Sequence, residues 1–246
     1  MPALGEPLAP SPGQAFVDLH CHSSASFDSL SRPADLVRVA AERGLTHLAI
    51  TDHERLDGAL EGRAHAPAGL TVIIGEEIRS ADGDVLGLFL QEAVGPGMSA
   101  EATVDAIHAQ GGLAGLPHPF DHYRNSGLKG DREVALASLA QKLDFIESYN
   151  ARVAFGDANE RAAQFALRNG LPGVASSDAH SLLEVGVACT IVPGPIETPD
   201  QLRAALAQAT LMPGRASYLV RGLTPLAKLI NRTRGNRRLG PLSPRR

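Results

Sequence analysis

The amino-acid sequence predicts a single α/β domain whose parallel sheet closes into a barrel of about seven strands. Short apolar segments alternate with segments of helical length and periodicity, a pattern typical of parallel strands joined by helices. Polar residues stand at or just beyond the C-terminal ends of six successive apolar segments. All strand ends meet at one face of a closed barrel, whereas in an open sheet only the loops at the switch point converge.

Each expected element rests on a local signal. Gly44, Gly111 and Gly170 follow apolar periodic stretches, as residues that end helices do. Thr198-Pro199 places proline in a first helical turn, with a capping-box spacing to Gln201. The expected strands are 16–19, 47–50, 71–74, 113–116, 145–146, 173–175 and 189–192, with a hairpin over 78–90. The expected helices are 31–42, 99–110, 133–141, 158–169 and one that begins near Thr198.

Length and composition narrow the class of protein. A chain of 246 residues with 43% hydrophobic content can bury a barrel-sized core. No apolar run approaches the roughly 18 residues that a membrane span needs. Two cysteines, Cys21 and Cys189, provide no disulfide framework, which favours a reducing cytoplasm. Residues 1–15, with four prolines, predict a flexible leader rather than a signal peptide.

Charge is distributed unevenly along the chain. Ten of the 23 basic residues, but none of the 27 acidic residues, follow Asp200. Residues 1–200 therefore carry 13 basic and 27 acidic side chains, a balance of −14. Residues 216–246 are predicted to be a basic C-terminal tail, with a short basic helix over 224–234 and partial disorder as the default expectation for the tail. Binding of RNA or anionic lipid by this tail is the alternative.

The stretch from Phe16 to Ser29 carries the densest group of potential ligands. Asp18, His20 and His22 alternate along an extended segment, so we expect them to point to one face and Cys21 to point into the core. Neutral imidazole and carboxylate suit zinc, iron, manganese or nickel rather than calcium. Histidine pairs of this spacing also occur on solvated strand ends, so the other strand ends must decide between the two interpretations.

Four further blocks follow other expected strands: Thr51-Asp52-His53, Gly75-Glu76-Glu77-Ile78, His118-Pro119 and Ser177-Asp178-Ala179-His180. With the first block, Asp18-Leu19-His20-Cys21-His22, they resemble the PHP (polymerase and histidinol phosphatase) superfamily of metal-dependent phosphoesterases. The resemblance extends roughly from Phe16 to Arg215 and keeps the order, the spacing and the strand-end placement of the blocks. It implies a distorted (β/α)7 barrel over 16–215.

The resemblance also implies two to three divalent transition-metal ions, which would be zinc, manganese or iron. The implied ligands are His20, His22, Glu77 and Asp178 for the first ion, Glu77 and His118 for the second, and Asp28, His53 and His180 for the third. Some relatives supply one more histidine to the second ion. In this sequence, the single histidine between Glu77 and His118 is His108, which lies inside an expected helix. Water or Glu147 would then complete the second ion, or the site would hold two ions firmly and a third weakly.

Catalytic roles follow from this chemistry. Ions joined by a bridging carboxylate lower the pKa of a bound water from near 16 toward about 7. We assign catalytic roles to Glu77, Asp178 and His180, and to Arg124 as a forked donor to a substrate phosphate. A surface salt bridge is the alternative for Arg124. Glu147 is expected to line the site.

The aspartates that precede ligand histidines have two open interpretations. Asp18 and Asp52 would either orient the imidazoles or cap strand ends. His47, His65 and His108 lie at a strand start, in a loop and on a helix, so we interpret them as structural or solvated.

The sequence as a whole predicts a cytoplasmic hydrolase that acts on phosphoric ester bonds of a small phosphorylated substrate. Two alternatives are a 5′–3′ exonuclease-type enzyme acting on RNA, DNA or nucleotides, and a non-catalytic metal-binding module. Because the barrel is acidic, only the basic tail would attract a nucleic acid. Removal of residues 222–246 is therefore expected to leave turnover of a small ester nearly unchanged. The oligomeric state stays open.

Overall fold

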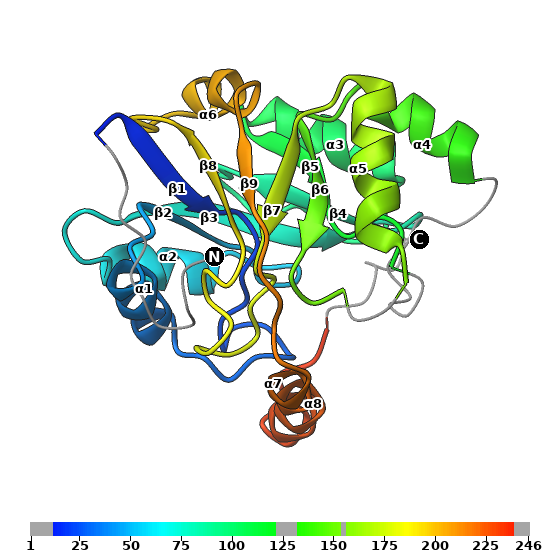
Figure 1. Cartoon of the computed structure of the whole chain (residues 1–246). Coiled ribbons are helices and arrows are strands. Elements are labelled where there is room, and N and C mark those ends of the chain that lie inside the picture. Colours follow the sequence, from blue (N-terminus) through cyan, green and yellow to red (C-terminus); the bar gives the residue numbers. More distant parts are fainter. Residues whose placement is uncertain (1–11, 122–131, 154–155, 239–246) are drawn as a thin grey trace.

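The computed structural model describes residues 12–121, 132–153 and 156–238. In this part of the chain, one curved sheet has the strand order β7-β6-β5-β4-β3-β2-β1-β8-β9, with helices on its outside (Figure 1). The strands are β1 (Gln14–Asp18), β2 (His47–Ile50), β3 (Thr71–Arg79), β4 (Asp84–Leu88), β5 (Leu113–Leu116), β6 (Phe145–Asn150), β7 (Gly173–Ser176), β8 (Cys189–Pro193) and β9 (Thr210–Met212). The helices are α1 (Pro33–Glu42), α2 (Asp57–Ala64), α3 (Ala100–Ala109), α4 (Arg132–Ala140), α5 (Ala158–Asn169), α6 (Pro199–Leu206), α7 (Tyr218–Arg221) and α8 (Leu223–Thr233).

The sheet curls until its two ends approach each other, so the single α/β domain contains a nearly closed barrel. Thr190 of β8 joins β7, because its hydroxyl accepts a hydrogen bond from the Ala175 N–H at 2.8 Å and donates one to the Ala175 carbonyl at 3.0 Å. One apolar cluster fills the barrel and includes Leu19, Ile73 and Phe145. The predicted barrel fold is confirmed.

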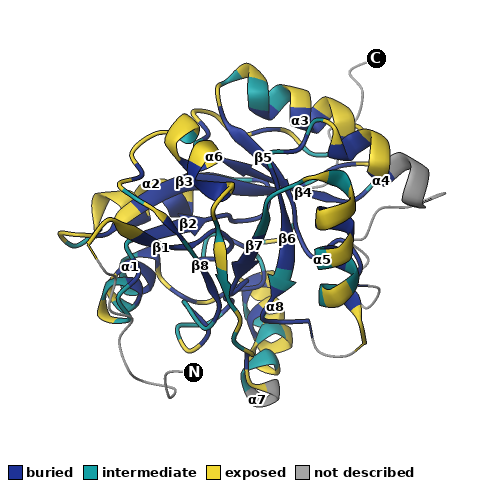
Figure 2. Ribbon diagram, turned by 45° about the horizontal axis from the view of Figure 1, so that its top comes forward, coloured by how far each residue is buried: buried dark blue, intermediate teal, exposed yellow. Residues whose placement is uncertain are grey.

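A second apolar cluster lies between the strands and the surrounding helices. It contains Leu36 of α1, Leu48 of β2 and Ile107 of α3, all fully buried. Figure 2 shows the resulting layers, with buried strands inside and helices whose outer faces are exposed. Cys21 is fully buried in this outer cluster, which confirms its expected place in the core.

Several local signals act as predicted. Gly44, Gly111 and Gly170 follow α1, α3 and α5 with φ of 81°, 79° and 65°, a conformation that costs other residues more. The Thr198 hydroxyl accepts from the Gln201 N–H, and the Gln201 side chain accepts from the Thr198 N–H, which completes the capping box of α6.

The sheet is not wholly parallel, which corrects the expected run of parallel strands. Strands β1, β2 and β3 are parallel, as are β5, β6 and β7, but β4 runs antiparallel to both β3 and β5. The expected strand 71–74 and the first arm of the hairpin are one strand, β3. The short turn of residues 80–83 between β3 and β4 leaves no room for the crossover connection that two parallel strands require. Strand β8 is likewise antiparallel to β1.

Helix α2 was not expected from the sequence. Its glycines, Gly58 and Gly62, lower the intrinsic helix propensity of the segment. They are needed for close packing, because a Cβ atom on Gly62 would lie 2.5 Å from Ile50 Cδ1 and one on Gly58 would lie 2.0 Å from Asp52 Oδ2. Tertiary contact therefore overrides the local preference.

In the basic C-terminal region, the short helix expected over 224–234 is present as α8, whereas the rest of residues 216–238 is more ordered than expected. Residues 218–221 and 223–233 form α7 and α8, which lie beside the barrel end toward which β6 and β7 point (Figure 1). The hydroxyl of Thr224 accepts from Arg152 Nη2 at 2.8 Å, and Arg221 Nη2 donates to the Ala151 carbonyl at 3.0 Å. Composition alone predicted disorder because it does not report these long-range contacts.

The expected leader, residues 1–15, lies mostly outside the described residues, although Gln14 and Ala15 already belong to β1. No helix in the described part of the chain is long and apolar enough to cross a membrane.

Candidate metal centre

The strand ends bring the predicted ligands together at one end of the barrel. His20 and His22 follow β1, His53 follows β2, and Glu77 lies within β3. His118 follows β5, whereas Asp178 and His180 follow β7. Each of these side chains is at least nine-tenths buried. The expected convergence of the strand ends is therefore present. At His118 and Asp178 it also depends on sharp turns of the backbone.

Backbone strain marks two of these positions. His118 and Asp178 have φ of 27° and 50°, a region that residues other than glycine rarely occupy. Such conformations persist only where surrounding structure enforces them, and they cluster at functional sites. The strict alternation expected along 18–22 also ends early, since β1 stops at Asp18 and Leu19 and Cys21 belong to different cores.

The first group of potential ligands consists of His20, His22, Glu77 and Asp178. The Nε2 atoms of His20 and His22 are 3.0 Å apart, and Glu77 Oε2 lies 3.4 and 3.3 Å from them. Asp178 Oδ1 lies 3.6 and 3.5 Å from the same two nitrogens. Neighbouring ligands around an ion at about 2.0–2.1 Å are separated by roughly 3.0–3.4 Å. These separations fit a divalent transition-metal ion.

Glu77 connects this group to His118. Its Oε2 atom faces His20 and His22, whereas its Oε1 atom lies 3.2 Å from His118 Nε2. One carboxylate therefore offers an oxygen to each of two neighbouring positions, which is the geometry of a bridging ligand.

Glu147 contacts the imidazole of His20 in the first group and the main chain of His118. Its Oε1 atom is 3.1 Å from His20 Nδ1, and its Oε2 atom accepts from the His118 N–H at 2.8 Å. With the Nδ1 proton directed to Glu147, the lone pair of His20 Nε2 is left facing Glu77 and Asp178. Asn150 Nδ2 donates to Glu147 at 2.8 Å and to Asp178 Oδ2 at 3.0 Å. Asn150 was not anticipated from the sequence, because nothing in its local pattern distinguishes it.

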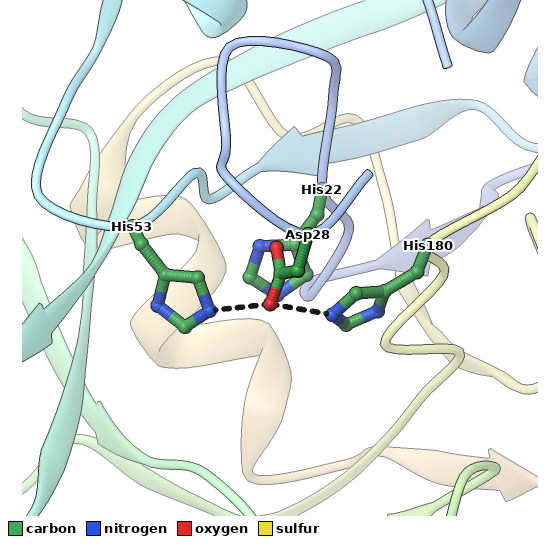
Figure 3. A group of neighbouring side chains, drawn as sticks. All are labelled: His22, Asp28, His53 and His180. Carbon is green, nitrogen blue, oxygen red and sulfur yellow. Dashed lines mark hydrogen bonds and ion pairs between the residues drawn. The ribbon is translucent and has the colours of Figure 1, made fainter. Parts of the chain in front are cut away.

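A further group surrounds Asp28, whose Oδ2 atom lies between two imidazoles (Figure 3). His53 Nε2 is 3.2 Å and His180 Nε2 is 3.3 Å from this oxygen, and His22 belongs to the same group. His180 Nδ1 is 2.8 Å from the Asp178 carbonyl, a contact that directs the Nδ1 proton away from Asp28. Three imidazoles and one carboxylate are suitable ligands for zinc, manganese or iron.

Electrostatics agree with a site built for cations. Burial lowers the pKa of His53, but the Glu77 and Asp28 carboxylates outweigh it and raise the pKa to about 9. Burial, together with the neighbouring His180 imidazole, lowers the pKa of His22 to about 3. Burial would raise the pKa of Asp28, but His53 and His180 hold it well below its usual value. A metal ion would therefore displace a proton from His53 on binding.

Asp18 and Asp52 cap backbone groups, which supports the second of their two interpretations. Asp18 accepts from the N–H groups of Ser177 and Gly186, each at 3.0 Å. Asp52 accepts from the Ser23 N–H and hydroxyl, each at 2.6 Å. Burial raises the pKa of Asp18 to about 6 and that of Asp52 to about 7.

Three histidines contact partners away from the centre, as expected. His47 Nε2 lies 2.8 Å from the Ile196 carbonyl, and His65 Nδ1 lies 2.9 Å from the Glu61 carbonyl. His108 on α3 pairs with Asp144 at 2.9 Å. Arg124, proposed to hold a phosphate, lies outside the described residues.

We expect His65→Gln and His108→Gln to leave metal content unchanged and turnover within about threefold of the parent, because exposed or half-exposed polar contacts contribute little. Steady-state kinetics and elemental analysis of the two variants check this. A loss of activity in His108→Gln as large as in a ligand variant would contradict its placement on an outer helix.

Arg238 is the functional candidate that sequence reasoning missed. It comes from the region expected to be disordered, yet Nη2 lies 3.2 Å from His53 Nδ1. No sequence motif marks Arg238 as a site residue. Its neighbours in sequence belong to no motif, and its contacts are with residues more than 150 positions earlier in the chain.

Taken together, a nearly closed α/β barrel with buried histidine and carboxylate groups at one end defines a protein of the metal-binding barrel class. The sequence profile of the PHP domain matches residues 18–153, and that of the PHP-associated family matches residues 156–211. The chain therefore belongs to the PHP family, as the sequence motifs predicted.

Known proteins support this assignment. An uncharacterized protein of Methanocaldococcus jannaschii is 36% identical over 145 residues, which are 54% of this chain and 81% of that protein. A two-domain protein from Bacteroides vulgatus, described as containing a predicted PHP-like metal-dependent phosphoesterase, has a TM-score of 0.70 at 21% identity and covers 85% of this chain and 68% of its own. A lesion-specific endonuclease from Pyrococcus furiosus has a TM-score of 0.57 at 18% identity, and the match covers 81% of this chain and 58% of that protein. At these identities the two structures support the fold.

Proposed function

We propose that this protein is a metal-dependent hydrolase that cleaves a phosphate ester of a small substrate. The observation that carries the proposal is the position of Glu77, whose two oxygens face separate groups of buried nitrogen ligands. Divalent ions bound there would supply Lewis acidity, by lowering the pKa of water and neutralising phosphate oxygens. Family membership and the phosphoesterase description of a structural neighbour support the same class of reaction.

The chain's own residues have distinct tasks in this proposal. His20, His22, Glu77 and Asp178 would hold the first ion, Glu77 and His118 the second, and Asp28, His53 and His180 the third. Glu147 keeps His20 in the required tautomer, and burial of the whole group excludes bulk water. Zinc, manganese and iron are the candidate metals, and the number of ions is two or three.

The first experiment compares substrates on the metal-loaded protein. p-Nitrophenyl phosphate, nucleoside monophosphates, nucleoside 3′,5′-bisphosphates, histidinol phosphate and a short RNA are tested with manganese, zinc and iron. We expect turnover of at least one small ester, abolished by chelation and restored by metal. Activity confined to the RNA would instead identify a nuclease, the activity that the Pyrococcus furiosus neighbour carries in its name. Absence of hydrolysis with every substrate and metal would favour the binding-module alternative.

A further inference from the structure

We propose that Arg238 is a substrate-binding residue, supplied by the C-terminal segment, whose fixed guanidinium contacts the phosphate beside His53. The inference rests on the proposed function, since it names the residue that would hold the anionic part of the substrate. It assigns a site role to residues 231–238, a segment that composition alone presented as a dispensable tail.

Two asparagines attach this segment to the loop that carries Asp28. Asn231 Nδ2 donates to the carbonyls of Ser26 and Ser29 at 3.2 and 2.9 Å, and the Asn231 side chain is buried. Asn236 Nδ2 donates to the Ala25 carbonyl at 3.0 Å, and Asn236 Oδ1 accepts from Arg55 Nη1 at 3.3 Å. Hydrogen bonds to main-chain carbonyls on both sides of Phe27 hold the segment in one register against the metal centre.

The guanidinium of Arg238 is anchored by carboxylates on two different elements. Its Nε atom donates to Glu54 Oε1 at 3.0 Å, and its Nη2 atom donates to Asp84 Oδ1 at 3.1 Å. The side chains of Glu54 and Asp84 are 0% and 2% exposed, whereas that of Arg238 is 28% exposed. A planar group held at two positions loses little further conformational entropy when it binds an anion.

The guanidinium of Arg238 lies next to the proposed ligands. Nη2 lies 3.2 Å from His53 Nδ1, which is itself 3.3 Å from Glu77 Oε2. None of the hydrogen bonds that Arg238 makes to described residues uses Nη1. Because Nε and Nη2 already donate to Glu54 and Asp84, the two N–H groups of Nη1 are the donors that remain for a substrate phosphate.

Two more basic side chains, Lys228 and Arg55, lie near the loop that carries Asp28. Lys228 Nζ lies 5.4 Å and Arg238 Cζ lies 5.8 Å from the centroid of the Phe27 ring, and Phe27 itself stacks 5.0 Å from His53. Arg55 lies on the same loop through its 2.8 Å bond to the Ala25 carbonyl. Arg55 also pairs with Asp57 at 2.7 Å and Arg238 with two carboxylates, so Lys228 is the side chain of the three for which no carboxylate partner is seen among the described residues and which would attract an anionic substrate.

A purely structural role for Arg238 is the alternative, because the guanidinium neutralises two buried carboxylates. Removing it alone would leave Glu54 uncompensated and Asp84 paired only with Arg79, at 3.1 Å, which would destabilise the loop. The double variant Glu54→Gln/Arg238→Gln removes one carboxylate together with the guanidinium, so it separates charge neutralisation from phosphate binding. Arg237→Gln is the matched control, because Arg237 is an exposed neighbour of the same type.

The test uses the full-length, metal-loaded protein with inorganic phosphate as the probe. Elemental analysis and thermal melting are recorded for the parent, Arg237→Gln, Arg238→Gln and the double variant, together with phosphate Kd by calorimetry. We expect both Arg238 variants to weaken phosphate binding about 10- to 100-fold and to raise KM more than they lower kcat. Metal content should stay at the parental value, and Arg237→Gln should match the parent throughout.

Two results would overturn the inference. One is parental phosphate affinity in the double variant with its metal complement intact. The other is loss of an ion from the double variant, which would show that Arg238 only keeps His53 in place. A parent that binds phosphate through Arg238 but hydrolyses no ester would contradict the proposed function alone. A parent that hydrolyses esters, with a double variant of unchanged phosphate affinity, would contradict this inference alone.

Discussion

Replacing Glu77 by glutamine is expected to lower ester turnover by about a thousandfold or more, because one carboxylate faces two groups of ligands. The amide keeps the size of the side chain but removes the charge that joins the ions. We expect the purified variant to lose at least one equivalent of metal while its far-ultraviolet circular dichroism stays unchanged. Steady-state kinetics combined with elemental analysis measure both effects.

Glu76 provides a matched control one position away. Its side chain is also fully buried, but Oε2 accepts from the Val94 N–H at 2.8 Å, away from the metal centre. Burial raises the pKa of Glu76 to about 8, so this group is mostly neutral at pH 7 and glutamine closely resembles it. Glu76→Gln should retain turnover within about threefold of the parent. Equal losses in the two variants would show that charge removal perturbs the barrel rather than the ions.

Removal of metal is expected to lower thermal stability as well as activity. An ion present at about 1,000 times its Kd stabilises the folded state by about 4 kcal/mol. For a domain of this size, each kcal/mol shifts Tm by about 2–4 °C, so chelation should lower Tm by roughly 8–16 °C. Readdition of manganese or zinc should restore both. Differential scanning calorimetry with and without chelator provides the measurement.

The variant His20→Ala tests the same centre through one ligand. We expect the parent to bind at least two equivalents of transition metal and His20→Ala to bind at least one fewer. His20 contributes the nitrogen that lies 3.0 Å from His22 Nε2, so alanine removes one member of the first group of potential ligands. His65→Ala, far from the centre, serves as the control. Full metal occupancy in His20→Ala would contradict the ligand set.

Strand periodicity and strand-end chemistry were sufficient to predict the barrel, and the resemblance of the sequence motifs to the PHP superfamily predicted the family. Short apolar segments that end in polar residues can be recognised in a sequence, because the side-chain period and the boundary of a strand are local properties. The glycine stops of α1, α3 and α5 and the capping box of α6 were predicted for the same reason. The sequence motifs also indicated which histidines lie together and which lie elsewhere.

Strand direction and register could not be read in the same way. The hairpin around Asp82-Gly83 was predicted and pairs β3 with β4, but the antiparallel pairings of β4 with β5 and of β8 with β1 were not. The sharp backbone turns at His118 and Asp178 also direct side chains to positions that a regular strand does not reach. Helix α2 was missed because Gly58 and Gly62 serve tertiary packing rather than local propensity. Each of these features depends on residues that are distant in sequence.

The order of residue types along the strands therefore determined the fold class, because periodicity is carried by neighbouring residues, and the resemblance of the motifs to the PHP superfamily implied the family and the set of potential metal ligands. Only the tertiary structure decided that Glu147 supports His20 and that the basic C-terminal segment lies on the Asp28 loop with Arg238 beside His53. The physical reason is that a buried charge is stable only where opposite charges surround it. Glu54 and Asp84 supply those charges for Arg238, and folding alone brings the three together.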